Sequence, residues 1–367
     1  MRMNHLAALK AANREQMRFE FASGRVELEA SPRILFVELA RHCNLACQMC
    51  REPGQIGKEM RMSEALFDRI AAELFPAAEI VDLRGWGESL ILPEWPERLA
   101  AAISHGCEVR IVTNLSYSKP VVLESLVKAK AWVGVSLDGA TQEVLNATRR
   151  GADLALIQEN LQYLGAAYRS AGIANRLRLY VTCQRPNLST LEDMIDIAAR
   201  CGLPLVSLGP VFAVDTNLVN INGMSSQLND ALNRASRRAA EKQVTLVQTA
   251  NLWEGQSVKD TDGPCCHPWT HCYLTYNGGV GFCDHLIGTH GDPFLIGHLD
   301  SAPFRSIWNS SEWQELRREH LGERRADMPF FEECAWCYRN RYTDIEDLLE
   351  PVLEANRKYL YRASARQ

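Results

Sequence analysis

Three cysteines within eight residues constrain this chain more than any other feature of its sequence. Cys43, Cys47 and Cys50 are spaced four and three residues apart and follow the apolar run 34–40. Three thiolates alone do not complete a structural zinc site, which takes four protein ligands. They can bind three irons of an iron–sulfur cluster and leave the fourth iron open, because such clusters take thiolate ligands. The spacing therefore predicts a cluster with one vacant iron, with a short zinc loop as the alternative.

The pattern Cys-x3-Cys-x2-Cys after a first strand resembles the radical SAM superfamily. The resemblance implies a [4Fe–4S] cluster whose vacant iron binds the amino and carboxylate groups of S-adenosylmethionine (SAM). It also implies a flavodoxin- or ferredoxin-type reductant and a 5′-deoxyadenosyl radical that takes a hydrogen atom from the substrate. The resemblance covers roughly residues 30–345 and indicates the mechanism, but not the substrate.

Composition limits the class of protein. The 367 residues carry a net charge of −5 and 23% charged residues without a basic stripe, which argues against a nucleic-acid partner. No apolar run approaches the ~20 residues of a membrane-spanning helix, and residues 1–18 lack the apolar core of a signal peptide. The twelve cysteines are therefore expected to bind metal in a reducing cytoplasm rather than to form disulfides.

Apolar, β-branched runs alternate with helical patterns along most of the chain. The six runs are 34–40, 80–84, 109–113, 132–137, 177–182 and 205–208. Strands that alternate with helices form a parallel sheet with right-handed crossovers, and six units are too few for an eight-stranded barrel. The sequence predicts an α/β fold, a partial (βα)6 TIM barrel at 33–245 after a helical or extended segment at 1–32. Functional side chains are expected at the C-terminal ends of its strands.

Beyond residue 245 the pattern combines cysteines with a β-hairpin. Asn277-Gly278 is a strong type I′ turn signal within the run 273–282, and an amphipathic helix is expected at 304–320. Four cysteines gathered from this region can hold either zinc or an iron–sulfur cluster. They are Cys265, Cys283, Cys334 and Cys337.

This arrangement resembles the twitch region of radical SAM enzymes, a SPASM-like domain that carries one auxiliary [4Fe–4S] cluster. Cys265 and Cys266 compete for the first ligand position, and similar sequences favour Cys265. A full SPASM domain would need further cysteines after Cys337, and none follow in this sequence. We therefore expect one auxiliary cluster in a domain at 246–345 and a C-terminal helix at 346–367.

Polar residues at the strand ends extend the resemblance, although turn chemistry alone would also account for them. The segment Gly85-Trp86-Gly87-Glu88 follows the second strand, where radical SAM enzymes bind the methionine amino group. Glycines allow backbone carbonyls to approach an ammonium closely. The other implied SAM contacts are Asn114, Ser136 and Arg149, with Arg150 as the alternative to Arg149. The substrate contact expected from its position is Asp138, with Asp215 and Asp284 as weaker candidates.

Cys183 ends the fifth strand, where the substrate is expected. A cysteine is more often a small buried apolar residue than a reagent. No cluster motif uses this thiol, however, whereas Cys107 and Cys201 belong to the opposite rim. An S–H group close to a carbon radical can donate a hydrogen atom, and donation to the opposite face inverts the carbon. We therefore predict a catalytic role for Cys183.

These features favour a radical SAM epimerase that acts on a carbinol carbon of an aminoglycoside sugar. The resemblance is to aminoglycoside epimerases and dehydrogenases, such as the type that acts at C2′ in hygromycin B assembly. In the dehydrogenase alternative, the same carbon loses its electron to the auxiliary cluster and becomes a ketone. A peptide-modifying enzyme is disfavoured, because only 42 residues precede Cys43 and a peptide-recognition domain is expected to be longer. A zinc-stabilised binding protein is the alternative outside enzymes.

Overall fold

The computed structural model describes most of the chain, and the described residues form two compact units. The described residues are 2–47, 49–50, 59–211, 221, 223–248, 265–284, 286, 294–322 and 334. Unit 1 contains residues 1–43, 52–111 and 262–336, and unit 2 contains residues 44–51, 112–261 and 337–367.

Unit 1 is built on six hydrogen-bonded strands in the order β10-β9-β8-β1-β2-β3. Strand β1 pairs in parallel with both β2 and β8, and β2 pairs in parallel with β3. Strand β9 pairs antiparallel with β8 and β10. The bounds are β1 Ile34–Val37, β2 Ile80–Asp82, β3 Glu108–Thr113 (its last two residues belong to unit 2), β8 His271–Leu274, β9 Gly279–Gly281 and β10 Gly297–His298.

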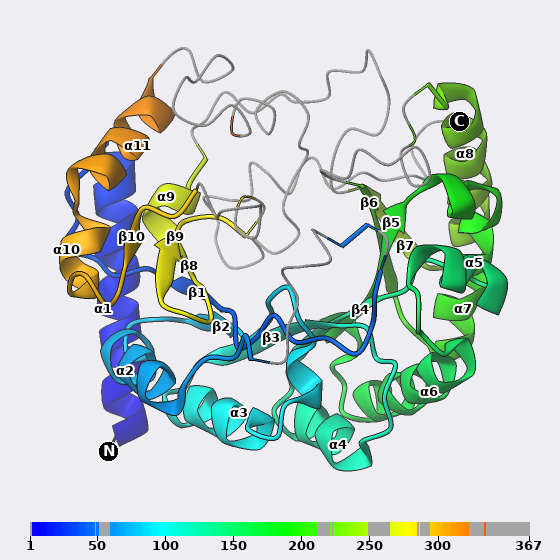
Figure 1. The fold of residues 1–367 in the computed structure, drawn as a ribbon, viewed down its shortest axis with the longest axis horizontal. Coiled ribbons are helices and arrows are strands. Elements are labelled where there is room, and N and C mark those ends of the chain that lie inside the picture. Colours follow the sequence, from blue (N-terminus) through cyan, green and yellow to red (C-terminus); the bar gives the residue numbers. More distant parts are fainter. Residues whose placement is uncertain are drawn as a thin grey trace. The chain divides into compact units, whose positions relative to one another are not determined.

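The helices of unit 1 lie outside its strands, with α2 and α3 on one side of β1, β2 and β3 (Figure 1). Their bounds are α1 Arg2–Ala22, α2 Glu64–Leu74, η2 Ser89–Ile91, α3 Trp95–Ser104, α9 His267–Thr270, α10 Phe304–Trp308 and α11 Ser311–Leu321. All four residues of β1 are buried, as expected for a parallel strand covered on both faces. Helix α2 begins after Ser63, whose side chain accepts a hydrogen bond from Leu66 N at 3.2 Å.

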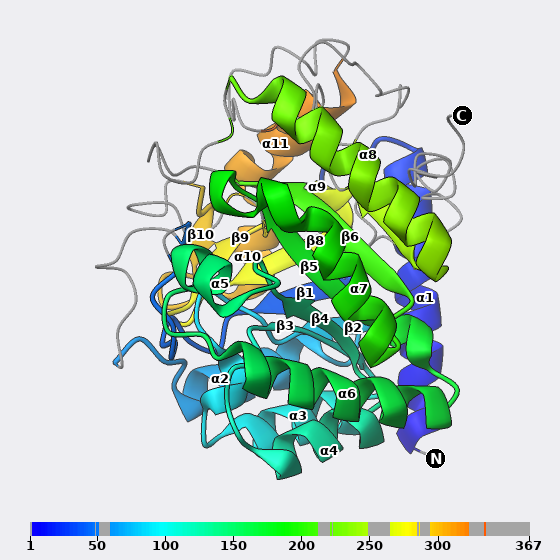
Figure 2. The ribbon, with the colours of Figure 1, turned by 90° about the vertical axis from the view of Figure 1, so that its right-hand side faces the viewer.

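The described residues of unit 2 form four parallel strands in the order β4-β5-β6-β7. Helices α6, α7 and α8 pack in front of them in Figure 2. The strands are β4 Trp132–Ser136, β5 Leu177–Cys183, β6 Leu205–Pro210 and β7 Thr245–Gln248. The helices are α4 Pro120–Lys128, α5 Gln142–Thr148, α6 Leu154–Ser170, η3 Ala174–Arg176, η4 Arg185–Thr190, α7 Leu191–Cys201 and α8 Ser225–Lys242. Helix α7 ends at Gly202, whose φ of +74° gives the left-handed cap that glycine favours.

The predicted α/β fold is confirmed, since helices and parallel strands alternate within both units. The predicted hairpin is also confirmed as β8–β9, with Gly278 at a φ of +96° in its turn. The prediction of one helix at 304–320 is wrong, because the chain forms two helices there. Ser310 caps the second of them by accepting from Trp313 N at 3.3 Å. The expected C-terminal helix at 346–367 lies outside the described residues.

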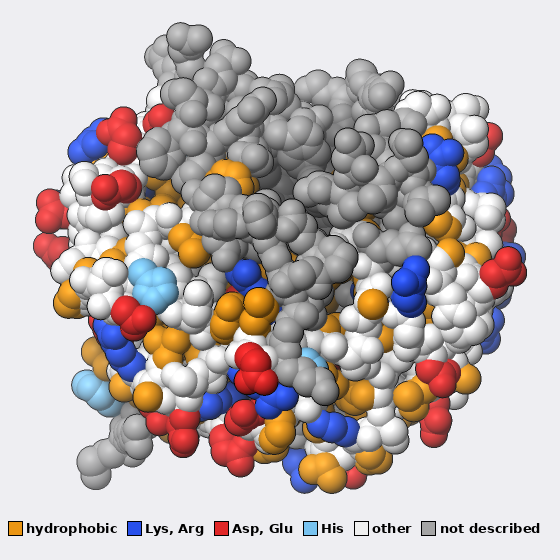
Figure 3. Space-filling view, viewed as in Figure 1, with side chains coloured by type: hydrophobic (Ala, Val, Ile, Leu, Met, Phe, Trp, Pro, Cys, Tyr) orange, Lys and Arg blue, Asp and Glu red, His pale blue; other side chains and the backbone are white. Residues whose placement is uncertain are grey.

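The surface carries charges of both signs. Lys and Arg side chains are interspersed with Asp and Glu on the face seen in Figure 3, which agrees with a protein of small net charge. Among the described helices, none is long and apolar enough to cross a membrane.

Candidate metal and cofactor sites

The segment Gly85–Glu88 lies alongside the residues that lead from β1 into the cysteine motif. Gly87 N donates to Ala40 O at 3.0 Å, and Glu88 N donates to His42 O at 2.8 Å. A Cβ at Gly87 would clash with the carbonyl oxygen of His42. This close approach of two backbones requires glycine. The carboxylate of Glu88 is buried and accepts from Leu90 N at 3.3 Å, so it caps the start of η2.

The three cysteines of the first motif are half-buried. Cys43 belongs to unit 1, and Cys47 and Cys50 belong to unit 2. Burial raises the pKa of the Cys47 thiol, and the Arg149 side chain, which donates a hydrogen bond to that thiol, opposes the rise. Three thiols at this spacing fit the ligand set of an iron–sulfur cluster.

Asn114 contacts the cysteine loop through its side chain. Its Nδ2 donates to Asn44 Oδ1 at 2.9 Å, while Asn44 Nδ2 donates to Ser116 O at 2.8 Å. Ser116 N in turn donates to Asn114 Oδ1 at 2.8 Å. These bonds connect the first residue after Cys43 to the end of β3. The structure thus gives Asn114 a role in holding the cysteine loop, and its expected contact with SAM stays a prediction.

Asp138 and Arg149, expected from the sequence to contact substrate and SAM, form an ion pair with each other. Arg149 Nε lies 2.7 Å from Asp138 Oδ2. Asp138 is completely buried, and it also accepts from Thr182 N at 2.7 Å and from Gln184 Nε2 at 3.3 Å. Ser136 ends β4 opposite Tyr180 of β5 and is half-buried.

Cys183 is the last residue of β5, as predicted, and it is completely buried. Burial raises the pKa of its thiol to about 12, and the charge of nearby Asp138 adds to the rise. The raised pKa extends the pH range over which the side chain keeps its S–H hydrogen. In contrast, Cys107 lies 3.4 Å from Lys10 Nζ at the other end of the strands of unit 1.

A second group of metal-ligating atoms lies in unit 1, around the hairpin β8–β9. Ligand atoms of His267, Cys283 and Asp284 all lie within 4.8 Å of one another. Cys265 is half-buried, Cys334 is buried, and Cys337 lies outside the described residues. Cys283 supplies the thiolate that a [4Fe–4S] cluster takes, and Asp284 beside it pairs with Arg84 at 3.3 Å. His267 was not predicted from the sequence, although its position two residues after Cys265 is a signal that could have identified it.

Two other cysteines, Cys266 and Cys272, belong to the helix and the strand that precede the turn of the hairpin. Cys272 is completely buried on β8, where it pairs with Leu35 of β1, and burial raises its pKa well above the ordinary value. Cys266 caps α9, and its carbonyl accepts from Trp269 N and Thr270 N. Which of Cys265 and Cys266 binds the auxiliary cluster stays a prediction.

Comparison with known families agrees with both metal sites. Residues 37–198 match the model of the Radical SAM superfamily, and residues 265–338 match SPASM, an iron–sulfur cluster-binding domain. The chain is a radical SAM enzyme with a SPASM domain. Its cofactors are therefore SAM and two [4Fe–4S] clusters, as predicted, while the residues that bind them and the shortened twitch form of the domain stay predictions.

Individual relatives of this radical SAM enzyme differ in their named activities. The chain is 28% identical over 301 residues to the mycofactocin maturase MftC of Mycobacterium tuberculosis, which covers 78% of this chain and 73% of the relative. It is 25% identical over 362 residues to an AdoMet-dependent heme synthase of Methanosarcina barkeri, covering 89% of this chain and 96% of the relative. Neither name indicates an aminoglycoside, so the predicted substrate has no support from these two relatives.

Among solved structures, SuiB of Streptococcus suis has the same fold. The structure with bound S-adenosylmethionine gives a TM-score of 0.63 at 13% identity and covers 84% of this chain and 72% of that chain. This likeness confirms the predicted α/β fold, and the match to SPASM confirms the predicted C-terminal cluster domain.

Proposed function

We propose that this radical SAM enzyme is an epimerase in which Cys183 returns a hydrogen atom to a substrate carbon. The observation that carries the proposal is the place of the buried Cys183 side chain at the end of β5. Burial also raises its pKa to about 12, so the S–H bond persists well above neutral pH, and a thiolate would have no hydrogen atom to give. Its place at the C-terminal end of a parallel strand is where such α/β enzymes bind their substrates.

The reaction balances as two hydrogen-atom transfers and two one-electron reductions, because one electron would be consumed in cleaving SAM and a second in restoring the thiol. Bound SAM with its reduced cluster supplies the oxidising group that removes one hydrogen atom from the carbon. The Cys183 S–H bond then breaks and a C–H bond forms on the opposite face, which leaves a thiyl radical on the protein. One electron and one proton restore the thiol, and the reductant that radical SAM enzymes need, here a flavodoxin- or ferredoxin-type protein, supplies the electron.

We assign the inverted carbon to a carbinol centre of an aminoglycoside sugar. The support is the motif layout, with one auxiliary cluster and a cysteine at the end of the fifth strand. The net charge of −5 also favours association with a polycationic sugar.

The test is product analysis on a panel of pseudodisaccharides with SAM and a reductant under anaerobic conditions. Wild type should form an epimer, and Cys183→Ala should still cleave SAM while forming no epimer. Cys201→Ala is the matched control, because Cys201 is a buried cysteine that ends α7, and it should form the epimer at the wild-type level. An epimer formed by Cys183→Ala would contradict the proposal.

Two other outcomes correspond to the remaining candidates. A ketone product that forms equally in Cys183→Ala would indicate the dehydrogenase. A peptide substrate is favoured by the likeness to MftC, which is named as a maturase. If the enzyme converts a peptide and none of the sugars, the substrate assignment is wrong. The role of Cys183 would then be tested with the same Cys183→Ala variant on the peptide.

A further inference from the structure

Glu38 is the residue after β1, and its carboxylate is the meeting point of several donors in unit 1. Its side chain is completely buried. Oε1 accepts from Trp86 N at 3.2 Å and from the Tyr273 hydroxyl at 3.4 Å. Oε2 accepts from Tyr276 N at 3.3 Å. Arg41 Nε lies 3.3 and 3.2 Å from the two oxygens.

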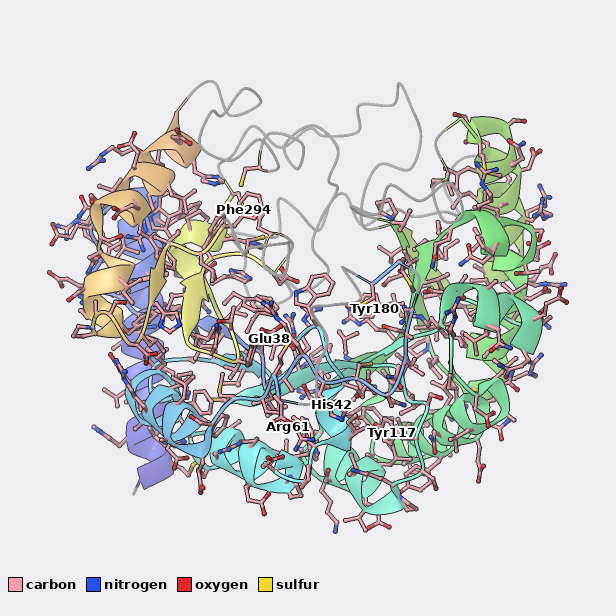
Figure 4. All side chains as sticks on the ribbon, in the orientation of Figure 1. Glu38, His42, Arg61, Tyr117, Tyr180 and Phe294 are labelled. Atoms are coloured by element: carbon pink, nitrogen blue, oxygen red, sulfur yellow. The ribbon has the colours of Figure 1, made fainter. Side chains whose placement is uncertain are left out.

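These donors come from three stretches of chain with different expected roles. Arg41 belongs to the run that leads into the cysteine motif. Trp86 belongs to the segment 85–88, which is expected to bind the methionine amino group of SAM. Tyr273 and Tyr276 belong to the hairpin of the SPASM domain. In Figure 4, Glu38 lies on the inner side of the strands, away from the helices of unit 1.

The side chain of Glu38 is also closely packed against its neighbours. A Cβ on Gly85 would clash with Cγ of Glu38, so glycine is needed for the segment 85–88 to approach it. The guanidinium of Arg41 also lies 5.4 Å from the centre of the Tyr276 ring. The side chain of Glu38 is thus fixed against both the segment 85–88 and the hairpin.

A second link runs parallel to this one. Arg84, directly before Gly85, lies 3.3 Å from Asp284, which directly follows Cys283. Arg84 also pairs with Asp82 at 3.1 Å and lies 4.9 Å from the centre of the Phe36 ring. The segment 85–88 and the hairpin are therefore joined on two sides through charged side chains.

A buried carboxylate is costly unless it is paired and hydrogen-bonded. Glu38 meets this condition with one guanidinium, two backbone N–H groups and one hydroxyl. Replacing the carboxylate by an amide would turn an –NH2 group toward at least one of these donors and leave a buried N–H without its acceptor. The loss of this hydrogen bond would destabilise the segment 85–88, the hairpin, or both.

We propose that Glu38 is a positioning residue that couples the SAM-binding segment 85–88 to the hairpin of the SPASM domain. One side chain then sets the geometry of the backbone around both cofactors. This inference rests on the expected role of residues 85–88 in SAM binding and is independent of whether the product is an epimer.

The experiment measures SAM affinity and the redox signature of the auxiliary cluster in anaerobically reconstituted protein. Glu38→Gln should weaken SAM binding about ten-fold and shift the midpoint potential and EPR spectrum of the auxiliary cluster. Tyr273→Phe removes only the hydroxyl on the hairpin side, so it should shift the auxiliary cluster and leave SAM affinity within about two-fold. Glu20→Gln is the matched control, because Glu20 is a completely buried carboxylate that binds Glu29 N and Ala30 N, and it should leave both readouts unchanged.

The proposal is overturned if Glu38→Gln leaves either readout at the wild-type value, or if Glu20→Gln changes both to the same extent. If Glu38→Gln does not fold, Tyr273→Phe decides, and an unchanged auxiliary-cluster potential overturns the coupling. Gly87→Ala tests separately the assumption that residues 85–88 bind SAM. SAM affinity at the wild-type level in that variant would show that they do not.

Discussion

Arg149 and Asp138 form an ion pair inside unit 2, with Nε 2.7 Å from Oδ2. Arg149 also donates to the thiol of Cys47, and Asp138 accepts from Thr182 N beside Cys183. The pair thus connects a cysteine of the cluster motif to the end of the strand that carries the proposed hydrogen donor. This connection accounts for the burial of both side chains without a substrate or a cofactor.

Asp138→Asn tests whether this pair is structural. The substitution leaves the guanidinium of Arg149 buried without its partner, so the free energy of unfolding should fall by roughly 3 kcal/mol. The measurement is urea denaturation of the anaerobic protein, with Asp300→Asn as the control. Asp300 has a 79% exposed side chain, and its substitution should change the free energy of unfolding by less than about 0.5 kcal/mol. Unchanged stability in Asp138→Asn together with weaker substrate binding would instead support the substrate contact predicted from the sequence.

Lys10 is predicted to stabilise the packing of α1 against the rest of unit 1. Its buried ammonium donates to the carbonyls of Phe75 (2.8 Å) and Ala78 and lies 3.4 Å from the thiol of Cys107. Lys10→Met keeps the apolar stem but leaves these carbonyls unpaired, so it should lower the free energy of unfolding by about 2 kcal/mol. Lys128→Met, at an exposed position on α4, is the control for thermal and chemical denaturation. Equal stability of the two variants would contradict the role of Lys10.

Local patterns in the sequence predicted the elements of the fold because helices and strands depend on neighbouring residues. Gly278 formed its turn as expected, since a turn depends on a few neighbouring residues. Pairing between distant segments was not predictable in this way. The run 34–40 was predicted only as an apolar strand, although Glu38 within it bonds to Tyr273, 235 residues away.

For the candidate site, too, local motifs could be predicted from the sequence, whereas contacts between distant residues could not. The cysteine motifs could be recognised from their spacing, because iron–sulfur clusters take thiolate ligands. The roles of their individual cysteines and of Cys183 stay predictions. Arg84 could not be predicted, because arginine is common on surfaces and only the fold brings it to Asp284. His267 has a signal in its position two residues after Cys265, but only the fold shows that it lies beside Cys283.

The pKa of Cys183 gives a prediction for pH dependence. A thiol donates a hydrogen atom only while it is protonated, and a raised pKa extends the protonated range upward. Because the pKa of Cys183 rises from 9.0 to about 12, the yield of epimer per SAM cleaved should stay constant as the pH rises from neutral through 9.0. A thiol with the ordinary pKa of 9.0 would lose half of its S–H at that pH. The measurement is the ratio of epimer to 5′-deoxyadenosine across the pH range, and a ratio that falls by half at pH 9.0 would contradict the buried, protonated thiol.

The cluster ligands give a prediction for metal content. If Cys283 binds the auxiliary cluster, Cys283→Ala should remove that cluster and leave the iron of the first motif in place, so iron per chain should fall by about half. Cys272→Ala is the matched control, because Cys272 is buried on the neighbouring strand and should leave iron content unchanged. Loss of iron in Cys272→Ala, or full iron content in Cys283→Ala, would show that the ligands are wrongly assigned.

The origin of the hydrogen atom that returns to the substrate tests the central claim most directly. The reaction is run in D2O with the substrate identified from the panel, and the product is analysed by mass spectrometry and NMR. Exchange of the Cys183 S–H with solvent predicts one deuterium per product molecule, bound to the inverted carbon. A product that carries no solvent deuterium on carbon would contradict the account.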